Sequence, residues 1–327
     1  MKAWRVNELG APSQVMRLET VQRPRPGPGQ VLVRVTGAAA NFPDVLMCRG
    51  VYQMRPPLPF TPGVEVCGEI VEIGGEVAGF GIGDRVLGGT TLPDGGFAEY
   101  ALMEAANTFA APTALDDAEA SALLVGYQTG WFGLHRRAGL RPGETLLVHA
   151  AAGGVGSAAV QLGKAAGATV IGVVGGSEKA AYAKDLGADV VVDRRTEDFV
   201  EVVKEVTGKR GADVIFDPVG GDVYARSTKC VAFEGRILVV GFAGGDITTT
   251  SLNHPLVKNY SVVGLHWGLY NVQEPAAVAE CHAELTRMAA NGSIRPLIGE
   301  RLALADIAGG VQRLADGETV GRVVYAL

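Results

Sequence analysis

TLLVHAAAGGVGSAAVQLGKAAG, residues 145–167, decides the fold of this chain. The apolar run 145–150 leads directly into AAGGVG, residues 151–156, and then into small and apolar residues at helical spacing that end at Gly167. AAGGVG follows a G-x-G-x-x-G pattern with alanine in the place of the first glycine. Such a turn lets the backbone approach a pyrophosphate, which the helix N-terminus then attracts. The segment therefore predicts a dinucleotide-binding strand–turn–helix unit.

The same alternation of strand and helix continues beyond this unit. The six predicted strands are residues 145–150, 169–174, 189–193, 213–217, 236–241 and 261–267. Ser177 is expected to cap the helix after the second strand, and Thr196 the helix after the third. Continuous apolar strands joined by helices indicate a parallel sheet covered on both faces. Six of them fit an α/β, doubly wound Rossmann sheet made of two mononucleotide-binding halves.

The flanking regions have a different character. Residues 1–122 contain short alternating strands separated by turn residues, which is typical of a mainly β, barrel-like domain. Residues 271–327 contain two helical patterns and a last strand, and are too short for a core of their own. We therefore predict one domain made of 1–122 plus 271–327, with a Rossmann domain of 123–270 inserted into it.

Composition excludes several classes of protein. The net charge of −6 provides no broad surface for phosphates, so nucleic acid is not an expected partner. The apolar stretches are broken by charged residues and glycines, so no membrane span is expected. The first residues have no apolar signal core. The four cysteines are widely spaced and form no CxxC pair, which indicates reduced thiols and a cytoplasmic protein.

The end of the second predicted strand bears on the choice between NAD and NADP. NAD sites usually place an acidic residue there to bind the ribose hydroxyls. This chain has Gly175, Gly176 and Ser177 instead, with Lys179 close by and Arg194 after the third strand. The alternative is that the two cations are ordinary solvated side chains. The missing carboxylate favours NADPH, whose 2′-phosphate the hydroxyl and the cations would bind.

Further cofactor contacts are expected along the same edge of the sheet. FDPVGG, residues 216–221, and VVGFAGG, residues 239–245, lie at the ends of strands, where ligands bind in doubly wound sheets. The alternative for both is an ordinary tight turn. The residues expected to contact the cofactor from these turns and from the first glycine turn are Gly153, Gly154, Val155, Gly156, Val219, Gly241 and Phe242.

Several segments together resemble the medium-chain dehydrogenase/reductase superfamily, and within it the zeta-crystallin-type NADPH:quinone oxidoreductases. The segments that carry the resemblance are residues 39–52, 59–74, 83–86, 95–100, 149–156 and 216–221. The resemblance covers essentially the whole chain. It implies a split, GroES-like catalytic domain around the Rossmann domain, a cleft between the two, and a homodimer.

The resemblance also assigns site residues. It implies that Asn41 and Asp44 lie near the nicotinamide, that Tyr52 faces the substrate, and that Thr129 lies near the nicotinamide ring. His266 is expected in the pocket or at the dimer seam. Each residue has a plainer alternative: a turn cap, a helix start, a packed aromatic ring or a structural histidine.

The zinc-dependent relatives differ from this chain at two ligand positions. Where they have cysteine this chain has Asn41, and where they have histidine it has Val64, just before Glu65. The four-cysteine structural zinc lobe is also missing. Zinc sites need three or four cysteine, histidine or carboxylate ligands, and Cys48 and Cys67 alone do not supply them. We therefore expect an enzyme without a metal.

These observations predict hydride transfer from NADPH to a small molecule, either a quinone or an α,β-unsaturated carbonyl compound. The Tyr52 hydroxyl or the Asn41 amide would stabilise charge on the acceptor oxygen. One rival is an enoyl-thioester reductase, whose pocket needs a basic rim; its candidates are Arg49, Arg55 and Arg136. A rival of another class is a non-catalytic NADPH-binding protein, either a structural crystallin or an RNA binder.

Overall fold

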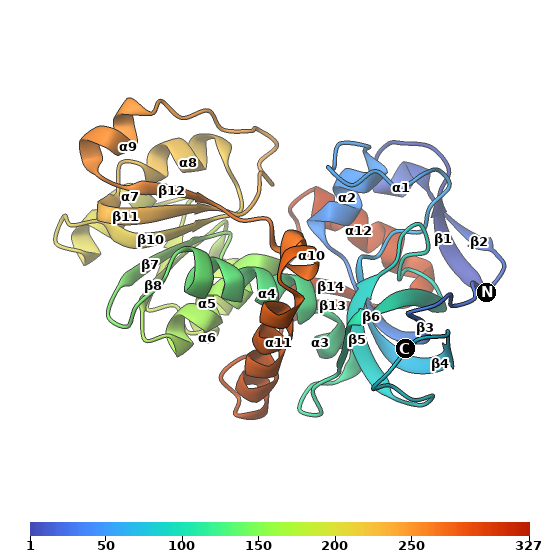
Figure 1. Ribbon diagram of the computed structural model, residues 1–327. Coiled ribbons are helices and arrows are strands. Elements are labelled where there is room, and N and C mark those ends of the chain that lie inside the picture. The colour runs from blue at the N-terminus through green and yellow to red at the C-terminus, as the bar shows by residue number, and fades with distance from the viewer. The chain divides into compact units, whose positions relative to one another are not determined.

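The computed structural model describes all 327 residues, which form two compact units (Figure 1). The first unit consists of Met1–Val125 and Pro275–Leu327, and the second of Gly126–Glu274. Each unit is built around its own sheet of six strands. None of the helices combines the length and apolar character that crossing a bilayer requires.

The second unit contains a wholly parallel sheet. Its strands are β7 (Thr145–His149), β8 (Thr169–Val174), β9 (Val190–Asp193), β10 (Ala212–Asp217), β11 (Val231–Val239) and β12 (Ser261–Gly264). Their order is β12-β11-β10-β7-β8-β9, and every neighbouring pair is parallel. This is the order of a doubly wound sheet, in which the winding reverses between β7 and β10. The predicted Rossmann architecture is confirmed.

Helices cover both faces of this sheet, as Figure 1 shows for α5 and α8. The helices are α4 (Leu124–Trp131), the π-helical η1 (Phe132–Arg137), α5 (Gly154–Ala165), α6 (Ser177–Asp185), α7 (Phe199–Val206), α8 (Gly221–Ser227), α9 (Asn253–Lys258), the short 3₁₀ turn η2 (Trp267–Leu269) and α10 (Tyr270–Gln273). Successive side chains of β7 serve different faces. Leu146 packs against Gly163 of α5, whereas Leu147 joins a core cluster with Phe199 of α7 and Tyr224 of α8.

Two helix caps differ from the prediction. The N-cap of α6 is Gly176, whose φ of 108° lies in a region that favours glycine, so Ser177 is the first helical residue. The N-cap of α7 is Asp198, whose carboxylate accepts a backbone N–H from the first turn. Thr196 instead donates its hydroxyl to the carbonyl of Asp193. Helix α6 begins after Gly176 because glycine tolerates this backbone conformation. Helix α7 begins after Asp198 because the Asp198 carboxylate is a strong acceptor for the free N–H groups of the first turn.

The sheet of the first unit is mainly antiparallel. A separate two-stranded sheet, β1 (Lys2–Val6) and β2 (Met16–Thr20), accompanies it; the main strands are β3 (Gln30–Ala39), β4 (Glu65–Ile73), β5 (Arg85–Thr90), β6 (Tyr100–Ala110), β13 (Ile298–Leu302) and β14 (Arg322–Ala326). Strand β3 pairs with both β4 and β6, so four strands close on themselves like a barrel. The C-terminal strand β14 pairs antiparallel with β3 and brings β13 with it. Strand β13 was not predicted from the sequence. Its residues alternate between half-buried and exposed, so none of them gives the signal of a buried strand face.

One helix of 16 residues, α11, and several short ones complete the first unit. They are α1 (Pro12–Val15), α2 (Phe42–Cys48), α3 (Asp117–Ser121), α11 (Pro275–Ala290), the 3₁₀ turn η3 (Leu304–Asp306) and α12 (Ile307–Ala315). Only two residues, Ala40 and Asn41, lie between the end of β3 and the start of α2, and the buried Val45 and Met47 anchor the helix in the core. The end of β3 and the start of α2 therefore hold Asn41 in a fixed place between them.

Candidate active site

The start of α2 places two of the predicted site residues in contact. Asn41 is the N-cap residue, and its backbone N–H donates to Asp44 Oδ2 at 2.8 Å. The backbone N–H of Gly63 donates to Asp44 Oδ1 at 2.8 Å. Burial raises the pKa of Asp44 to about 7, although these two N–H groups act in the opposite direction. Asp44 thus ties the helix start to the loop before β4 and titrates near neutral pH.

The Asn41 side chain is hydrogen-bonded on both sides of its amide. Its Nδ2 donates to the Ala39 carbonyl at 3.0 Å and to Glu65 Oε1 at 2.9 Å, while its Oδ1 accepts from Arg322 Nη2 at 2.8 Å. An amide nitrogen carries two hydrogens, so both are engaged within the protein. In this arrangement the Asn41 amide has no hydrogen left to donate to a substrate oxygen.

Glu65 and Arg322 form a buried ion pair that the prediction did not assign to the site. The guanidinium of Arg322 contacts Glu65 Oε1, and both side chains are buried. The backbone N–H of Val125 donates to Glu65 Oε2 at 2.8 Å. Burial raises the pKa of Glu65, and Arg322 offsets part of that rise. The available signal was Arg322, the one charged residue of the apolar strand β14, because buried charges are almost always paired.

Tyr52 lies in the segment that follows α2, half-buried against the core of the first unit. Burial raises the pKa of its hydroxyl, and the neighbouring Asp44 carboxylate adds to the rise. A phenol of raised pKa keeps its proton at neutral pH, so it can donate a hydrogen bond. The structure therefore brings the three residues Asn41, Asp44 and Tyr52 into one region of the first unit.

The glycine turn of the second unit has the geometry that the sequence predicts. Ala150 adopts a φ of 51°, which reverses the chain after β7. A Cβ on Gly156 would lie 2.1 Å from the Ala150 carbonyl oxygen, so only glycine fits where α5 crosses the strand end. Gly153 is the N-cap, and Ser157 N–H is the first amide of α5 to bond back, to the Gly153 carbonyl at 2.8 Å. The preceding N–H groups, of Gly154, Val155 and Gly156, remain for an anion.

Three cations gather at the ends of β8 and β9. A Cβ on Gly175 would lie 3.1 Å from Arg194 Nε, and one on Gly176 would lie 2.9 Å from Arg195 Nη1. Burial lowers the pKa of Lys179, and the charges of Arg195 and Arg194 lower it further. Mutual repulsion of this kind is relieved when an anion binds. Arg195 was missed by the sequence reasoning, although it directly follows the predicted Arg194.

The turns after β10 and β11 are bonded to each other. Gly244 N–H donates to the Val219 carbonyl at 2.9 Å, and the Phe242 ring stands 2.7 Å from where a Cβ on Gly220 would be. Asp217, at the end of β10, is buried and accepts the N–H groups of Val219 at 2.8 Å and Gly220 at 3.0 Å. Asp217 thus shapes the turn that presents Val219, and Gly241 and Phe242 follow β11 at the same edge of the sheet.

The last two predicted cofactor residues, Thr129 and His266, are each next in sequence to a residue of one hydrogen-bonded pair, Gln128 and Trp267. Thr129 is buried in α4. Its neighbour Gln128 accepts the Trp267 Nε1–H at 2.9 Å, and Trp267 follows His266 at the end of β12. His266 lines a cavity of about 270 Å³; its other walls are Arg137, Gly264, Leu265, Leu269, Tyr270, Gln273 and Glu274.

Arg136, a candidate for the basic rim of an acyl-thioester pocket, forms an ion pair in this structure. Its guanidinium pairs with Glu274 and lies over the Tyr270 ring at 5.4 Å from the ring centroid. Tyr270 in turn stacks on Phe132 of η1 with ring centroids 4.2 Å apart. These contacts connect η1 to the segment that ends the second unit, and they pair Arg136 with a carboxylate.

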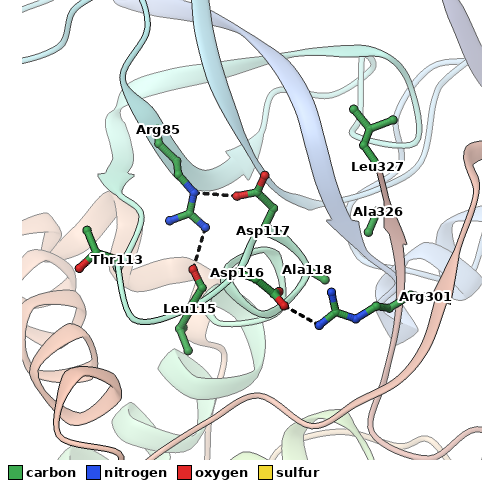
Figure 2. Close-up of a pocket in the computed structure, with 9 residues that line it drawn as sticks. All are labelled: Arg85, Thr113, Leu115, Asp116, Asp117, Ala118, Arg301, Ala326 and Leu327. Carbon is green, nitrogen blue, oxygen red and sulfur yellow. Dashed lines mark hydrogen bonds and ion pairs between the residues drawn. The ribbon is translucent and has the colours of Figure 1, made fainter.

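A second cavity, of about 540 Å³, lies in the first unit (Figure 2). Figure 2 shows its two arginines pointing at carboxylates: Arg85 Nε is 2.6 Å from Asp117 Oδ1, and Arg301 Nη2 is 2.6 Å from Asp116 Oδ2. None of the predicted site residues lines it. Both of its arginines are thus paired with aspartates of the same cavity.

The residues at the expected zinc position do not fit zinc. Asn41 presents an amide, and the Glu65 carboxylate is already paired with a guanidinium. Burial raises the pKa of both nearby thiols, Cys48 and Cys67, to about 12, so neither is a thiolate at neutral pH. No group of three or more potential ligand side chains occurs anywhere in the chain.

The fold, the residues around Asn41 and the cations beside Gly175 together define a class of oxidoreductase with a dinucleotide-binding domain and a GroES-like domain. Residues 154–283 match the family described as zinc-binding dehydrogenase, and residues 27–113 match the alcohol dehydrogenase GroES-like domain. A quinone oxidoreductase-like protein 2 homolog of Nematostella vectensis is 38% identical over 320 residues, which cover 97% of this chain and 87% of that protein. The chain belongs to the quinone oxidoreductase branch of the medium-chain dehydrogenase/reductase superfamily.

Two solved structures in this branch resemble the whole chain. Escherichia coli quinone oxidoreductase, complexed with NADPH, has a TM-score of 0.92 and 29% identity, and covers 100% of both chains. A mycobacterial protein complexed with NADPH has a TM-score of 0.93 and 30% identity, with the same coverage. The resemblance stated from the sequence is confirmed at the level of superfamily and branch.

Proposed function

We propose that this chain is an NADPH-dependent oxidoreductase that reduces a quinone or an α,β-unsaturated carbonyl compound. The observation that carries the proposal is the cluster of Lys179, Arg194 and Arg195 beside Gly175 and Gly176. The Asp193 carboxylate at the same place accepts the backbone N–H groups of Gly176 at 2.8 Å and Arg195 at 3.0 Å. NADPH supplies a hydride from its nicotinamide ring, and with one proton from solvent the acceptor is reduced and NADP⁺ is left.

The residues at the carboxyl edge of the Rossmann sheet would hold the cofactor. The N–H groups at the start of α5 face the pyrophosphate, and the cation cluster and Ser177 bind the 2′-phosphate. Val219, Gly241 and Phe242 form the joined turns beside the ribose and nicotinamide. The neighbouring structures solved with NADPH support the choice of cofactor.

The first unit would supply the acceptor's surroundings. Tyr52 keeps its proton and can donate to the carbonyl oxygen on which negative charge grows. Asn41, with both amide hydrogens engaged, shapes the site instead of donating to that oxygen. We accordingly assign 1–122 plus 271–327 as the catalytic domain and 123–270 as the NADP(H)-binding domain, with Thr129 and His266 near the nicotinamide.

We propose that turnover needs no zinc. The support is chemical: Arg322 provides the positive charge that balances Glu65, and the thiols nearby are protonated. As acceptor we propose a quinone or enone over an acyl thioester with phosphate groups. Of the three candidates for the basic rim, Arg136 is paired with Glu274, whereas Arg49 and Arg55 are exposed.

We also propose a cytoplasmic homodimer. The four cysteines are free and buried, which suits a reducing compartment. Strand β12 is the outermost strand of its sheet, and Val262 on it is exposed, as are Leu256 and Val257 of the preceding helix α9. An apolar sheet edge of this kind pairs readily with a second copy.

The decisive experiment is a screen of NADPH oxidation with a benzoquinone, a 2-alkenal and an enoyl-CoA thioester as acceptors, and with NADH as control. The proposal expects turnover with the first two and a preference for NADPH. Preferred reduction of the thioester would assign the rival reductase. Binding of NADPH, measured by tryptophan quenching, without oxidation by any acceptor would assign a non-catalytic protein. Dialysis against a chelator should leave turnover unchanged; loss that zinc restores would refute the metal-free proposal.

A further inference from the structure

We propose that Glu65 and Arg322 are positioning residues. They hold the side-chain amide of Asn41 in one orientation, and that orientation sets how Asn41 lies beside the reacting atoms. The inference rests on the proposed function for the placement of Asn41 near the nicotinamide. The fixed orientation of the amide, called the hold below, depends on residues of the first unit alone, so it can be examined separately from catalysis.

The amide is held because its two ends meet opposite kinds of partner. Arg322 only donates, and it meets Asn41 Oδ1 at 2.8 Å. The Glu65 carboxylate only accepts, and it meets Asn41 Nδ2 at 2.9 Å. A rotation of the amide by half a turn would set an N–H against the guanidinium and an oxygen against the carboxylate. Only one orientation is therefore compatible with the ion pair.

The pair itself is held in place by the fold. Glu65 begins β4, and its second oxygen accepts the Val125 N–H at 2.8 Å. Arg322 begins β14, and Val324 of that strand is in register with Ala39 of β3. Neither side chain can swing into water, because Glu65 is 0% and Arg322 5% exposed. The partners of Asn41 are thus as rigid as the two strands that carry them.

The pair costs desolvation energy that an apolar pair would avoid. Replacing a buried ion pair with apolar groups is often neutral for stability, whereas removing one partner is strongly destabilising. Arg322 Nε, moreover, is buried without a hydrogen-bond partner, which adds to the cost. A position that only had to be filled would not require these charges, but fixing an amide requires a donor and an acceptor on opposite sides.

The test compares R322K with the double variant E65Q/R322M. The double variant removes both charges together, so its thermal midpoint should stay nearer the wild-type value than that of R322M alone. Its kcat with NADPH and a benzoquinone should fall by at least about tenfold, since slight misplacement near the reacting atoms is enough for such a loss. Its Kd for NADPH, measured by tryptophan quenching, should stay within about twofold, because the residues assigned to the pyrophosphate and the 2′-phosphate belong to the other unit.

R322K keeps the charge that Glu65 needs and is the variant expected to fold in any case. Lysine lacks the planar fork of arginine and holds its partners less firmly, so kcat should fall by about fivefold. Arg17→Lys, on the exposed strand β2, is the matched control and should keep the wild-type kcat. A wild-type kcat in R322K or in the folded double variant would show that the pair only stabilises the fold, and would overturn the proposal.

A readout without turnover separates this inference from the proposed function. In the ¹⁵N-labelled wild type, the Asn41 side-chain NH₂ signals, assigned by their loss in N41L, should be sharp and slow to exchange with solvent. In R322K they should broaden or lose that protection. Unchanged signals would refute the hold on the amide even if the enzyme is active. Changed signals in a protein that oxidises no NADPH would leave the hold established and the proposed function refuted.

Discussion

The Nη2 atom of Arg322 lies 2.8 Å from the Oδ1 atom of Asn41, across 281 positions of the sequence. The contact exists because β14, near the end of the chain, pairs with β3, which leads directly into Asn41. The C-terminal segment thus contributes a residue to the candidate site, in addition to completing a sheet.

Gly156→Ala should weaken the nucleotide cradle. The added Cβ would lie 2.1 Å from the Ala150 carbonyl oxygen, so α5 must move away from the end of β7. We expect a loss of about 1–3 kcal/mol in unfolding free energy, as for other overpacked sites, and a raised Kd for NADPH. Denaturant unfolding and fluorescence titration measure the two effects. Gly75→Ala is the control, since a Cβ there meets nothing within 4 Å; equal behaviour of the two variants would contradict the cradle geometry.

Removal of the cation cluster should change the preference between cofactors. Replacing Lys179, Arg194 or Arg195 with alanine removes a charge-assisted bond to the 2′-phosphate. Each replacement should raise the Michaelis constant for NADPH by about tenfold and leave that for NADH nearly unchanged. Lys204→Ala, which breaks an exposed pair with Glu201, is the matched control. An equal effect on NADPH and NADH would show that the cluster does not bind the phosphate.

Tyr52→Phe should lower kcat more than it changes the affinity for NADPH. The variant keeps the packed ring and removes only the hydroxyl that we assign to the acceptor oxygen. Loss of one such donor typically slows turnover by about a hundredfold. Tyr100→Phe, in the same unit and also half-buried, serves as the comparison and should keep full activity. If both variants turn over at the wild-type rate, Tyr52 is only a packed aromatic residue.

The stability of the first unit should depend on pH through Asp44. Burial raises the pKa of Asp44 from 3.8 to about 7, so the folded state holds this proton more tightly than the unfolded state does. The resulting stabilisation is complete below the unfolded pKa, and it is lost as pH rises through about 7. Asp44→Asn cannot titrate, so its thermal midpoint should trail the wild-type midpoint most at pH near 5, and the gap should narrow toward pH 8. A gap that is constant across this range would contradict the raised pKa.

The exposed edge of the Rossmann sheet should govern the oligomeric state. Val262 on the outermost strand β12 is 40% exposed, and a charge there would be buried in a dimer that extends the sheet. We expect Val262→Lys to sediment as a monomer of 34.0 kDa and the wild type as a dimer. Val206→Lys, at a site on α7 that is 41% exposed, is the control and should remain dimeric. A monomeric wild type would remove the basis for the dimer.

Local patterns predicted most of the second unit. Five of its six strands lie close to the apolar runs in the sequence, because a strand buried on both faces has to be apolar throughout. The predictions that were wrong concern the first residues of two helices and one strand of the first unit. Gly176 and Asp198, not Ser177 and Thr196, cap two helices. Strand β13 was not predicted, because Gly299 and Arg301 are exposed and its other residues are only half-buried, so it carries no core signal.

The sequence by itself determined the Rossmann sheet, the glycine turn and the missing acidic residue at the end of β8, because each depends on residues that are neighbours in the chain. It also placed Asn41, Asp44 and Tyr52 within one short segment. Only the tertiary structure decided how the Asn41 amide is oriented. That choice depends on Glu65 and Arg322, whose charges are stable inside the protein only when strands distant in the sequence bring them into contact.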